Sequence, residues 1–158
     1  MKTIIRLATI EDLKSIQELN YKLFEEECDE FDSELDMSWT LWPEWKKYYT
    51  NNINNKNNCA FVAEINEQVV GYLVGSITEE KCPYRILPNM AELDDMFVLA
   101  EYRSMWIGSQ LHEKFIEWCK SKDVKKLQVS AYTWNIKAIN FYKKLGFWDF
   151  AVILEKDL

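Results

Sequence analysis

The sequence predicts a protein of the α/β (α+β) class, with a mixed central β-sheet that is mostly antiparallel and is flanked by helices. Two apolar, β-branched segments, 59–65 and 69–77, are separated by only three residues, which predicts an antiparallel hairpin. Segments 91–98 and 125–131 have strand composition and enclose an amphipathic segment. A strand–helix–strand crossover of this length joins parallel neighbours, so the sheet should contain one parallel strand pair.

Length and composition favour a single domain over residues 1–158. Hydrophobic residues make up 48% of the chain, and a chain of this size can bury a substantial core. No apolar run is long enough to cross a bilayer, and the N-terminal residues lack the pattern of a secretory signal. We therefore expect a cytoplasmic protein with no membrane partner.

Cysteine and histidine usage does not indicate a metal centre. The four cysteines are widely spaced without a C-x-x-C pair, and the only histidine, His112, is expected to be exposed. We expect no metal and reduced, structural thiols at Cys28, Cys59, Cys82 and Cys119.

The net charge of −7 argues against nucleic acid as a partner, because phosphate binding needs a basic face. An acidic chain can attract a cationic substrate, but acidity also serves solubility alone. Both interpretations remain open from composition.

The N-terminal half alternates strand and helix signals. Residues 2–7 have strand composition, and Thr9 is a plausible N-cap for a helix ending near Glu26. The Asn-rich stretch 51–58 is interpreted as a loop. In the helix between Thr9 and Glu26, the apolar residues recur at helical spacing: Ile10, Leu13, Ile16, Leu19 and Leu23.

An acidic stretch, residues 25–36, contains eight acids and no base and runs into an aromatic-rich segment. One interpretation is a solvated loop followed by an amphipathic helix whose aromatic residues pack on the sheet. The other is a substrate wall, in which carboxylates attract an ammonium group and aromatic faces hold it. The aromatic residues are Trp39, Trp42, Trp45, Tyr48 and Tyr49.

The composition of two further segments predicts a loop and a strand. Residues 81–89 contain two prolines and are interpreted as a loop that could lie over a cleft. Residues 149–155 are expected to form a final strand that completes the sheet.

Residues 96–111 pass from a strand through a turn into a helix that begins near Gly108 and Ser109. The first amides of a helix lack intrahelical partners and the helix dipole favours an anion, so the turn suits a phosphate. Arg103 adds a positive charge beside it. Taken alone, an ordinary strand-to-helix turn explains the same residues.

A second motif, N-x-x-A-x-x-F-Y-x-K-x-G-F, covers residues 135–147. Its apolar residues share one helical face, and Gly146 is a natural helix stop. The order of the two motifs, separated by a helix and a strand, resembles the GNAT superfamily of acyl-CoA-dependent N-acyltransferases. The resemblance covers the element order of nearly the whole chain and is specific in these two motifs.

The resemblance implies acetyl-CoA, a form of coenzyme A, as co-substrate. In that family the turn reads R-x-x-G-x-G/A and holds the pyrophosphate, while the parallel strands splay around the pantetheine arm. Arg103 and Gly108 match, but Trp106 stands where the first glycine is expected, and an indole does not allow the close backbone approach that glycine does. The implied cofactor-binding residues are Phe97, Val98, Arg103, Ser104, Trp106, Ile107, Gly108, Ser109, Asn135 and Lys143.

Tyr142 matches the family's usual general acid. A phenol titrates near ~10, close enough to an alkyl thiol to protonate a leaving thiolate. The resemblance also implies that a backbone amide near Phe97 or Val98 stabilises the oxyanion. The alternative for Tyr142 is a core aromatic residue on an amphipathic helix.

The catalytic base is assigned to Glu92 and Asp94, with Asp95 as a further candidate. Strand alternation places Glu92 and Asp94 on one face, opposite Leu93 and Phe97. Because acids on a central strand are costly to bury, they should face a cleft, where they act through water or attract the amine.

Together these features predict an N-acetyltransferase that transfers an acetyl group from acetyl-CoA to a primary amine by direct attack in a ternary complex. The acceptor is expected to be a small cationic molecule of the polyamine or aminosugar type, and the resemblance makes a homodimer possible. The alternatives are a peptide or protein amino group as acceptor, a non-catalytic acyl-CoA-binding regulatory module, or an interaction module that uses the acid–aromatic stretch.

Overall fold

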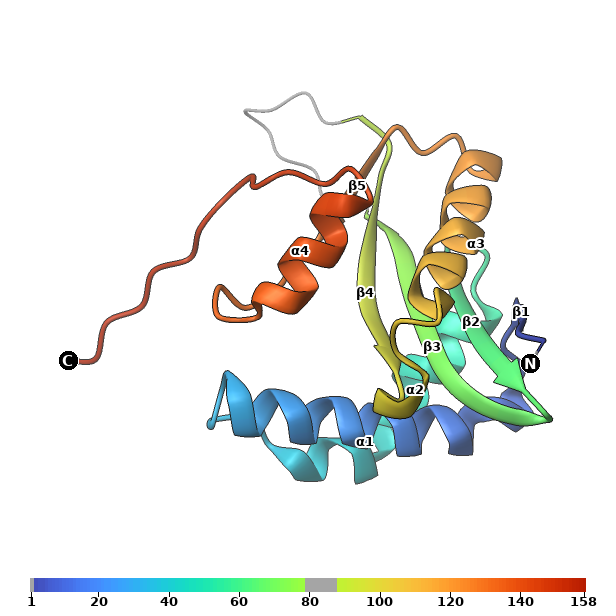
Figure 1. The fold of residues 1–158 in the computed structure, drawn as a ribbon, viewed down its shortest axis with the longest axis horizontal. Helices are drawn as coiled ribbons and strands as arrows, with labels where there is room; N and C mark the ends of the chain where they lie inside the picture. Colours follow the sequence, from blue (N-terminus) through green and yellow to red (C-terminus); the bar gives the residue numbers. More distant parts are fainter. Residues whose placement is uncertain (1, 79–87) are drawn as a thin grey trace.

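The structure is a computed structural model that describes residues 2–78 and 88–158, and these residues form a five-stranded sheet in the order β1-β2-β3-β4-β5 (Figure 1). The first four strands are antiparallel neighbours, whereas β4 and β5 are parallel. The predicted mixed sheet with one parallel pair is confirmed. The strands are β1 (Ile4–Leu7), β2 (Asn58–Ile65), β3 (Gln68–Thr78), β4 (Met90–Val98) and β5 (Lys126–Val129).

Helices cover both faces of this sheet. α1 and α2 pack together on one face, and α3 lies on the other, while α4 lies beyond β5 (Figure 1). The α-helices are α1 (Leu13–Glu30), α2 (Pro43–Asn54), α3 (Ile107–Ser121) and α4 (Ile136–Lys144). Short 3-10 helices are η1 (Ile10–Asp12), η2 (Met37–Leu41) and η3 (Ala100–Tyr102).

A buried amide fixes α1 and α2 against the sheet. The side chain of Asn20 in α1 accepts a hydrogen bond from the Trp45 indole of α2 at 2.7 Å and donates one to the Tyr72 hydroxyl of β3 at 2.9 Å. Because each polar atom has a partner, the contact is compatible with burial. Trp45 and Tyr49, only 2% and 1% exposed, are therefore core residues, as the packing interpretation of the aromatic segment predicts.

The hairpin between β2 and β3 turns through Asn66 and Glu67, both in the left-handed region with φ of 49° and 64°. Two successive left-handed residues are typical of a type I′ turn, whose twist matches that of the flanking strands. The predicted hairpin is confirmed, with a connection one residue shorter than expected.

The parallel pair parts halfway along β4. β5 pairs only with residues Met90 to Leu93, so Asp94 to Val98 continue without it. At the same point the register of β4 against β3 shifts, because Gly75 pairs with Leu93 and Val74 with Asp95. A bulge of this kind bends a strand and redirects its side chains, and it places Asp94 where the two parallel strands separate.

Two predicted boundaries are wrong. α1 continues to Glu30, so much of the acidic stretch is helical, and α2 continues to Asn54. Near its end α1 has Phe31 stacked on Tyr132, with ring centroids 5.9 Å apart, a tertiary contact that outweighs the unfavourable placement of acids at a helix C-terminus. In α2, the side chain of Asn52 accepts from Asn58 at 2.9 Å and so joins the helix end to β2.

The predicted final strand is also wrong. Residues 147–158 have no regular structure and run past α4 to a C-terminus that lies far from the sheet (Figure 1). β5 is an edge strand, but residues 147–158 do not pair with it, because β-propensity describes how side chains fit a sheet surface and does not by itself produce pairing. Near its start the segment lies beside α4, where the Asp149 carboxylate accepts a hydrogen bond from Lys143 at 2.8 Å.

Residues 81–87 of the predicted loop, including Cys82, lie outside the described residues. Among the described residues the cysteines are free thiols, and no helix has the length and apolarity needed to span a membrane. Within the same ranges, no group of three or more His, Cys, Asp or Glu side chains is arranged to hold a metal ion.

Replacing Gly75 with alanine is expected to lower the free energy of unfolding by about 2–3 kcal/mol. A Cβ atom there would lie 2.5 Å from Cε2 of Phe115 and 2.8 Å from the Glu92 carbonyl oxygen. Phe115 is fully buried, so it cannot move aside without disturbing the core. Urea unfolding of the Gly75→Ala variant measures the change.

The matched control is Gly108→Ala, whose added Cβ would lie 3.2 Å from Cζ of the half-buried Phe141. We expect a loss of no more than about 1 kcal/mol there, since alanine is also the better helix former. Equal losses in the two variants would contradict the assignment of the effect to Phe115.

Candidate active site

The turn between β4 and α3 presents the first amides of α3. Ser104 and Trp106 both have φ of 64°, and Trp106 immediately precedes the helix. The Gln110 amide donates to the Trp106 carbonyl oxygen at 3.0 Å, so the amides of residues 107–109 come before the first α-helical hydrogen bond. The Trp106 side chain is 77% exposed, which means that the indole extends into solvent.

Trp106→Gly is expected to raise the free energy of unfolding by up to about 1 kcal/mol. The left-handed conformation costs an L-residue ~1–2 kcal/mol, and the greater backbone freedom of glycine in the unfolded chain offsets part of that gain. Because the indole is outside the turn, we also expect acetyl-CoA affinity to stay equal or to increase. Thermal unfolding and titration calorimetry measure the two effects.

Trp134→Gly is the control for Trp106→Gly, because Trp134 is also 77% exposed but does not have a positive φ. It should be slightly destabilised, since glycine there gains no relief from strain. A tenfold or greater loss of acetyl-CoA affinity in Trp106→Gly would instead identify the indole as a cofactor contact.

Arg103 connects this turn to α1. Its guanidinium donates to both carboxylate oxygens of Glu26 at 2.7 and 2.8 Å and to the Val98 carbonyl oxygen at 2.8 Å. The same group lies over the Phe97 ring, 5.1 Å from its centroid. Arg103 therefore fixes the end of β4 relative to α1, a positioning contact that the phosphate interpretation of the sequence missed.

α4 places the second motif beside the first. The side chain of Asn135 accepts from the Ala138 amide at 3.0 Å and caps the helix, while Gly146, with φ of 95°, ends it. Phe141 approaches Gly108 closely. Lys143 is paired with Asp149 on the surface. Thus α4 packs near the start of α3, although Asn135 and Lys143 are engaged within their own segment.

Tyr142 is half-buried and lies between two aromatic neighbours. Its ring centroid is 5.4 Å from that of Phe141 and 5.7 Å from that of Phe147. Burial raises the pKa of Tyr142 to about 12, and the negative charges of Asp95 and Glu27 add to the shift. The hydroxyl is thus protonated at neutral pH and lies within the field of both carboxylates.

The β4 bulge brings two acids towards the α2 side of the sheet. Asp95 accepts from the Tyr49 hydroxyl at 2.6 Å, and Asp94 accepts from the Ser76 hydroxyl at 3.3 Å. Burial raises the pKa of each to about 6. The charge of Asp94 also contributes to the raised pKa of Tyr48 in α2.

The simple alternation that set Phe97 opposite Asp94 fails at the bulge. Glu92 remains near Asp94, whose pKa its charge helps to raise.

Glu27 in α1 is the functional candidate that sequence reasoning missed. Burial raises its pKa to about 7, and the charges of Asp95, Asp32 and Glu26 contribute. The signal was present, because Glu27 continues the spacing of the buried or half-buried positions Ile16, Asn20 and Leu23.

Tyr132, in the segment between β5 and α4, was also missed. Its hydroxyl donates to Asp32 at 3.0 Å and its ring stacks on Phe31. The end of α1 is therefore joined to the segment that leads into α4. This region contains carboxylates from α1, from the segment just after α1 and from β4, and phenols from α2, the β5–α4 segment and α4. We call it the acidic site, and its residues are Glu27, Asp32, Asp94, Asp95, Tyr48, Tyr132 and Tyr142.

His112 corrects a further expectation. It is buried, 6% exposed, with its ring 5.8 Å from that of Phe147, and burial lowers its pKa. It lies on the side of α3 that meets the end of α4 and has a packing role there.

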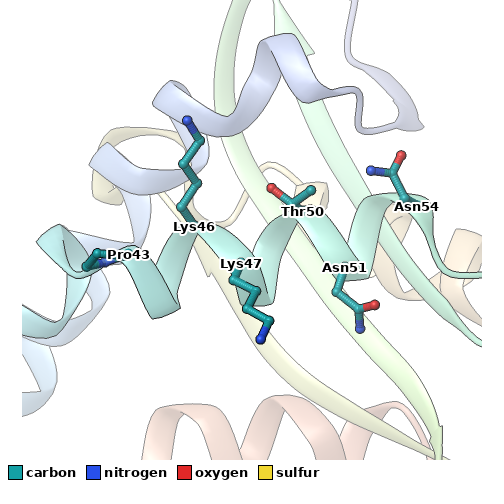
Figure 2. Close-up of a pocket in the computed structure, with 6 residues that line it drawn as sticks. All are labelled: Pro43, Lys46, Lys47, Thr50, Asn51 and Asn54. Atoms are coloured by element: carbon teal, nitrogen blue, oxygen red, sulfur yellow. The ribbon is translucent and has the colours of Figure 1, made fainter.

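A separate shallow pocket of about 580 Å³ lies along α2 (Figure 2). Its two lysine side chains point away from each other, and none of its lining residues is a predicted site residue (Figure 2). It is lined by Pro43, Lys46, Lys47, Thr50, Asn51 and Asn54.

Comparisons with known proteins find related sequences and solved structures with the same fold. An uncharacterised N-acetyltransferase of Methanocaldococcus jannaschii is 26% identical over 155 residues, covering 94% of this chain and 62% of that protein. A point mutant of the BH1408 protein from Bacillus halodurans superposes with a TM-score of 0.88 at 20% identity, over 98% of this chain and 99% of the other. AAC(6')-Iy, solved with a CoA-S-monomethyl-acetylneamine bisubstrate analogue, gives 0.75 at 16% identity, over 100% and 99%.

The two structural likenesses concern the fold, and the chain spans less than two thirds of the archaeal relative. The family follows from the sequence itself. Residues 15–147, which contain both motifs, match the model of the Acetyltransferase (GNAT) family, and the chain therefore belongs to that family.

Proposed function

We propose that the chain is an N-acetyltransferase that transfers an acetyl group from acetyl-CoA to a small cationic primary amine. The observation that carries the proposal is that Glu27 of α1 and Asp95 of β4 lie close enough to Tyr142 of α4 for their negative charges to add to its raised pKa. An acceptor ammonium group attracted by these carboxylates would stand beside the residue that matches the family's general acid.

The donor side of the proposal rests on the turn before α3 and on the separation of the parallel strands. The amides of Ile107, Gly108 and Ser109 suit a diphosphate, since the helix dipole favours an anion at this end. Beyond Leu93, β4 has no β5 partner, so its backbone there is available to an extended arm. We assign Phe97 and Val98 to that arm, and Ser104 to the phosphate turn.

The acceptor side rests on the acidic site. A cation is favoured wherever several partly buried carboxylates share a region, because each one raises the pKa of its neighbours and a bound cation relieves that repulsion. The phenol rings of Tyr48 and Tyr132 offer faces for the same cation. AAC(6')-Iy, which has the same fold, was solved with an aminoglycoside-derived analogue, which supports an amine-rich acceptor of aminosugar or polyamine type.

The proposed reaction is a direct transfer in a ternary complex. The acceptor ammonium group loses one proton to solvent through water held by Asp94 and Glu92, and its nitrogen then forms a bond to the thioester carbonyl carbon. The nitrogen loses its second proton through the same water as the amide forms. The carbon–sulfur bond breaks, and Tyr142 gives its proton to the departing thiolate. Because the pKa of Tyr142 is raised to about 12, the phenolate that remains takes up a proton from solvent at neutral pH after each turnover.

Thiol release from acetyl-CoA, followed against a panel of amines, tests the proposal. The panel contains polyamines, aminosugars, a peptide with a free N-terminus and an uncharged amine. We expect turnover with the cationic small molecules and little with the peptide. Binding of acetyl-CoA without turnover on any amine would reject the catalytic proposal and favour a regulatory acyl-CoA-binding module.

A further inference from the structure

We propose that Tyr49 is a positioning residue that holds the Asp95 carboxylate for the acceptor ammonium group, at the end of a buried chain of hydrogen bonds from Trp45. The inference rests on the proposed function, because it concerns an acid that would attract the acceptor. The Tyr49 hydroxyl of α2 donates to Oδ2 of Asp95 at 2.6 Å. Oδ1 receives no hydrogen bond from the described residues, so it is the oxygen left for the amine.

The bulge in β4 turns Asp95 towards α2. Before the bulge, Leu93 pairs with Gly75, which lies against α3. Regular alternation would place Asp95, two residues further on, on that same face. After the bulge Asp95 pairs with Val74, so its side chain lies on the opposite face, which α1 and α2 cover (Figure 1). The bulge therefore brings Asp95 to Tyr49 and not to α3.

Four side chains, each at most 2% exposed, form the chain that ends at Asp95. The Trp45 indole of α2 donates to the side-chain oxygen of Asn20 in α1 at 2.7 Å, and the Asn20 amide donates to the Tyr72 hydroxyl of β3 at 2.9 Å. The Tyr72 hydroxyl still has its own proton to donate, and the Tyr49 hydroxyl is its neighbour. Tyr49 then donates to Asp95.

The first member of the chain sets the direction of the hydrogen bonds. An indole N–H can only donate, so the Asn20 oxygen accepts and the Asn20 NH2 group donates. Because that donation is made to the Tyr72 oxygen, the Tyr72 proton points away from Asn20. Hydrogen bonds aligned in one direction strengthen one another in a protein interior. The buried indole gives the chain no route to solvent, so the chain holds the carboxylate and does not carry protons away.

Tyr49 is the group that favours the charged form of Asp95. Burial raises the pKa of Asp95 to about 6, and the hydrogen bond from Tyr49 opposes that rise. Among the described residues no lysine or arginine contributes to this pKa. The titratable groups that face Asp95 are acids and phenols: Glu27 of α1, Tyr48 of α2, Tyr72 of β3, Asp94 of β4 and Tyr142 of α4.

Titration of the Asp95 carboxyl tests the chain without any amine. NMR follows isotope-labelled aspartate carboxyl carbons against pH, and the loss of one signal in Asp95→Asn identifies Asp95. We expect a midpoint near pH 6 in the parent chain and about one pH unit higher in Tyr49→Phe, since one hydrogen bond to a charged group is lost. Trp45→Phe should raise the midpoint by a smaller amount, because Asn20 is then free to turn its amide.

Ile16→Val is the control for a general loosening of the core. Ile16 is fully buried on α1 but is outside the chain of hydrogen bonds. The variant should unfold at a lower urea concentration while the Asp95 midpoint stays unchanged. An unchanged midpoint in Tyr49→Phe, or an equal rise in Ile16→Val, overturns the proposal. If Tyr49→Phe does not fold, an unchanged midpoint in Trp45→Phe overturns it.

Kinetics show whether the held carboxylate serves the amine. For a small cationic amine at about pH 6.5, Tyr49→Phe should raise KM about three- to tenfold and change kcat less than about threefold. The rise should be smaller at about pH 8, where Asp95 is ionised in both chains. A shifted titration with an unchanged KM overturns the role in capture. Absence of turnover on every amine rejects the proposed function as well, whereas normal turnover with an unshifted titration rejects only the chain.

Discussion

Replacing Tyr142 with phenylalanine is expected to lower the turnover number about 100- to 1,000-fold, the usual scale for loss of a general acid or base. Binding of acetyl-CoA should change less than about threefold, because the phenylalanine ring keeps the packing against Phe141 and Phe147. Steady-state rates and calorimetry on the same preparation separate the two effects.

The physical reason lies in the surroundings of the hydroxyl. Burial and the charges of Asp95 and Glu27 raise the pKa of Tyr142 to about 12, so the group stays protonated throughout the working pH range. A thiolate leaving group next to these carboxylates would add a further negative charge to the acidic site. A proton from Tyr142 neutralises it as it forms, and phenylalanine has none to give.

Tyr132→Phe is the matched control for Tyr142→Phe. The pKa of Tyr132 is also raised to about 12, mainly by burial, but its hydroxyl is committed to Asp32 at 3.0 Å. We expect its removal to change turnover less than about tenfold, as for the loss of one hydrogen bond. A turnover number for Tyr142→Phe within threefold of the parent chain, or a larger loss in Tyr132→Phe, would exclude Tyr142 as the acid.

The parts of the fold that follow local patterns could be predicted from the sequence. Alternation and the short connection identified the β2–β3 hairpin, and the crossover length identified the parallel pair, because both depend on residues close together in the chain. The helix predicted to begin near Gly108, which begins at Ile107, and the helix stop at Gly146 were predicted for the same reason.

The parts that depend on distant contacts could not be predicted. α1 extends to Glu30 where the β5–α4 segment docks on it through Tyr132, a contact 100 residues away in sequence. The bulge at Asp94 depends on the register of β3, so alternation alone misplaced Phe97. Glu27 was missed because, in the sequence, an acid on an apolar helix face only interrupts the hydrophobic pattern. Its functional interest comes from the nearby Asp95, which is distant in the sequence.

Replacing Glu27 with glutamine is expected to lower kcat/KM for a small cationic amine about 10- to 100-fold at pH 8, the loss of one charged contact. An uncharged amine should lose less than about threefold, since it gains nothing from the carboxylate. Glu25→Gln is the matched control, because it removes the same charge from an exposed position on the same helix.

The pH dependence of KM for a cationic amine should also depend on Glu27. Glu27, with its pKa raised to about 7, and Asp95, with its pKa raised to about 6, must be ionised to attract a cation. For an amine that stays protonated, KM should therefore rise as the pH falls from about 8 to about 5. Because the two groups interact, the profile reports them jointly, and Glu27→Gln should remove its upper part near pH 7.

The effect of Glu27→Gln on stability should be opposite in direction to its effect on kcat/KM. A stability measurement therefore distinguishes weaker binding of the amine from damage to the fold. The pKa of Glu27 in the folded chain lies above its ordinary 4.5, so ionisation of this group opposes folding. Its contribution to stability is fully present below about pH 4.5 and is lost as the pH rises through about 7. Glu27→Gln should therefore be more stable than the parent chain at pH 8, measured by urea unfolding, while capturing cationic amines less well. A variant that is both less stable and less active at pH 8 would instead make Glu27 a structural residue.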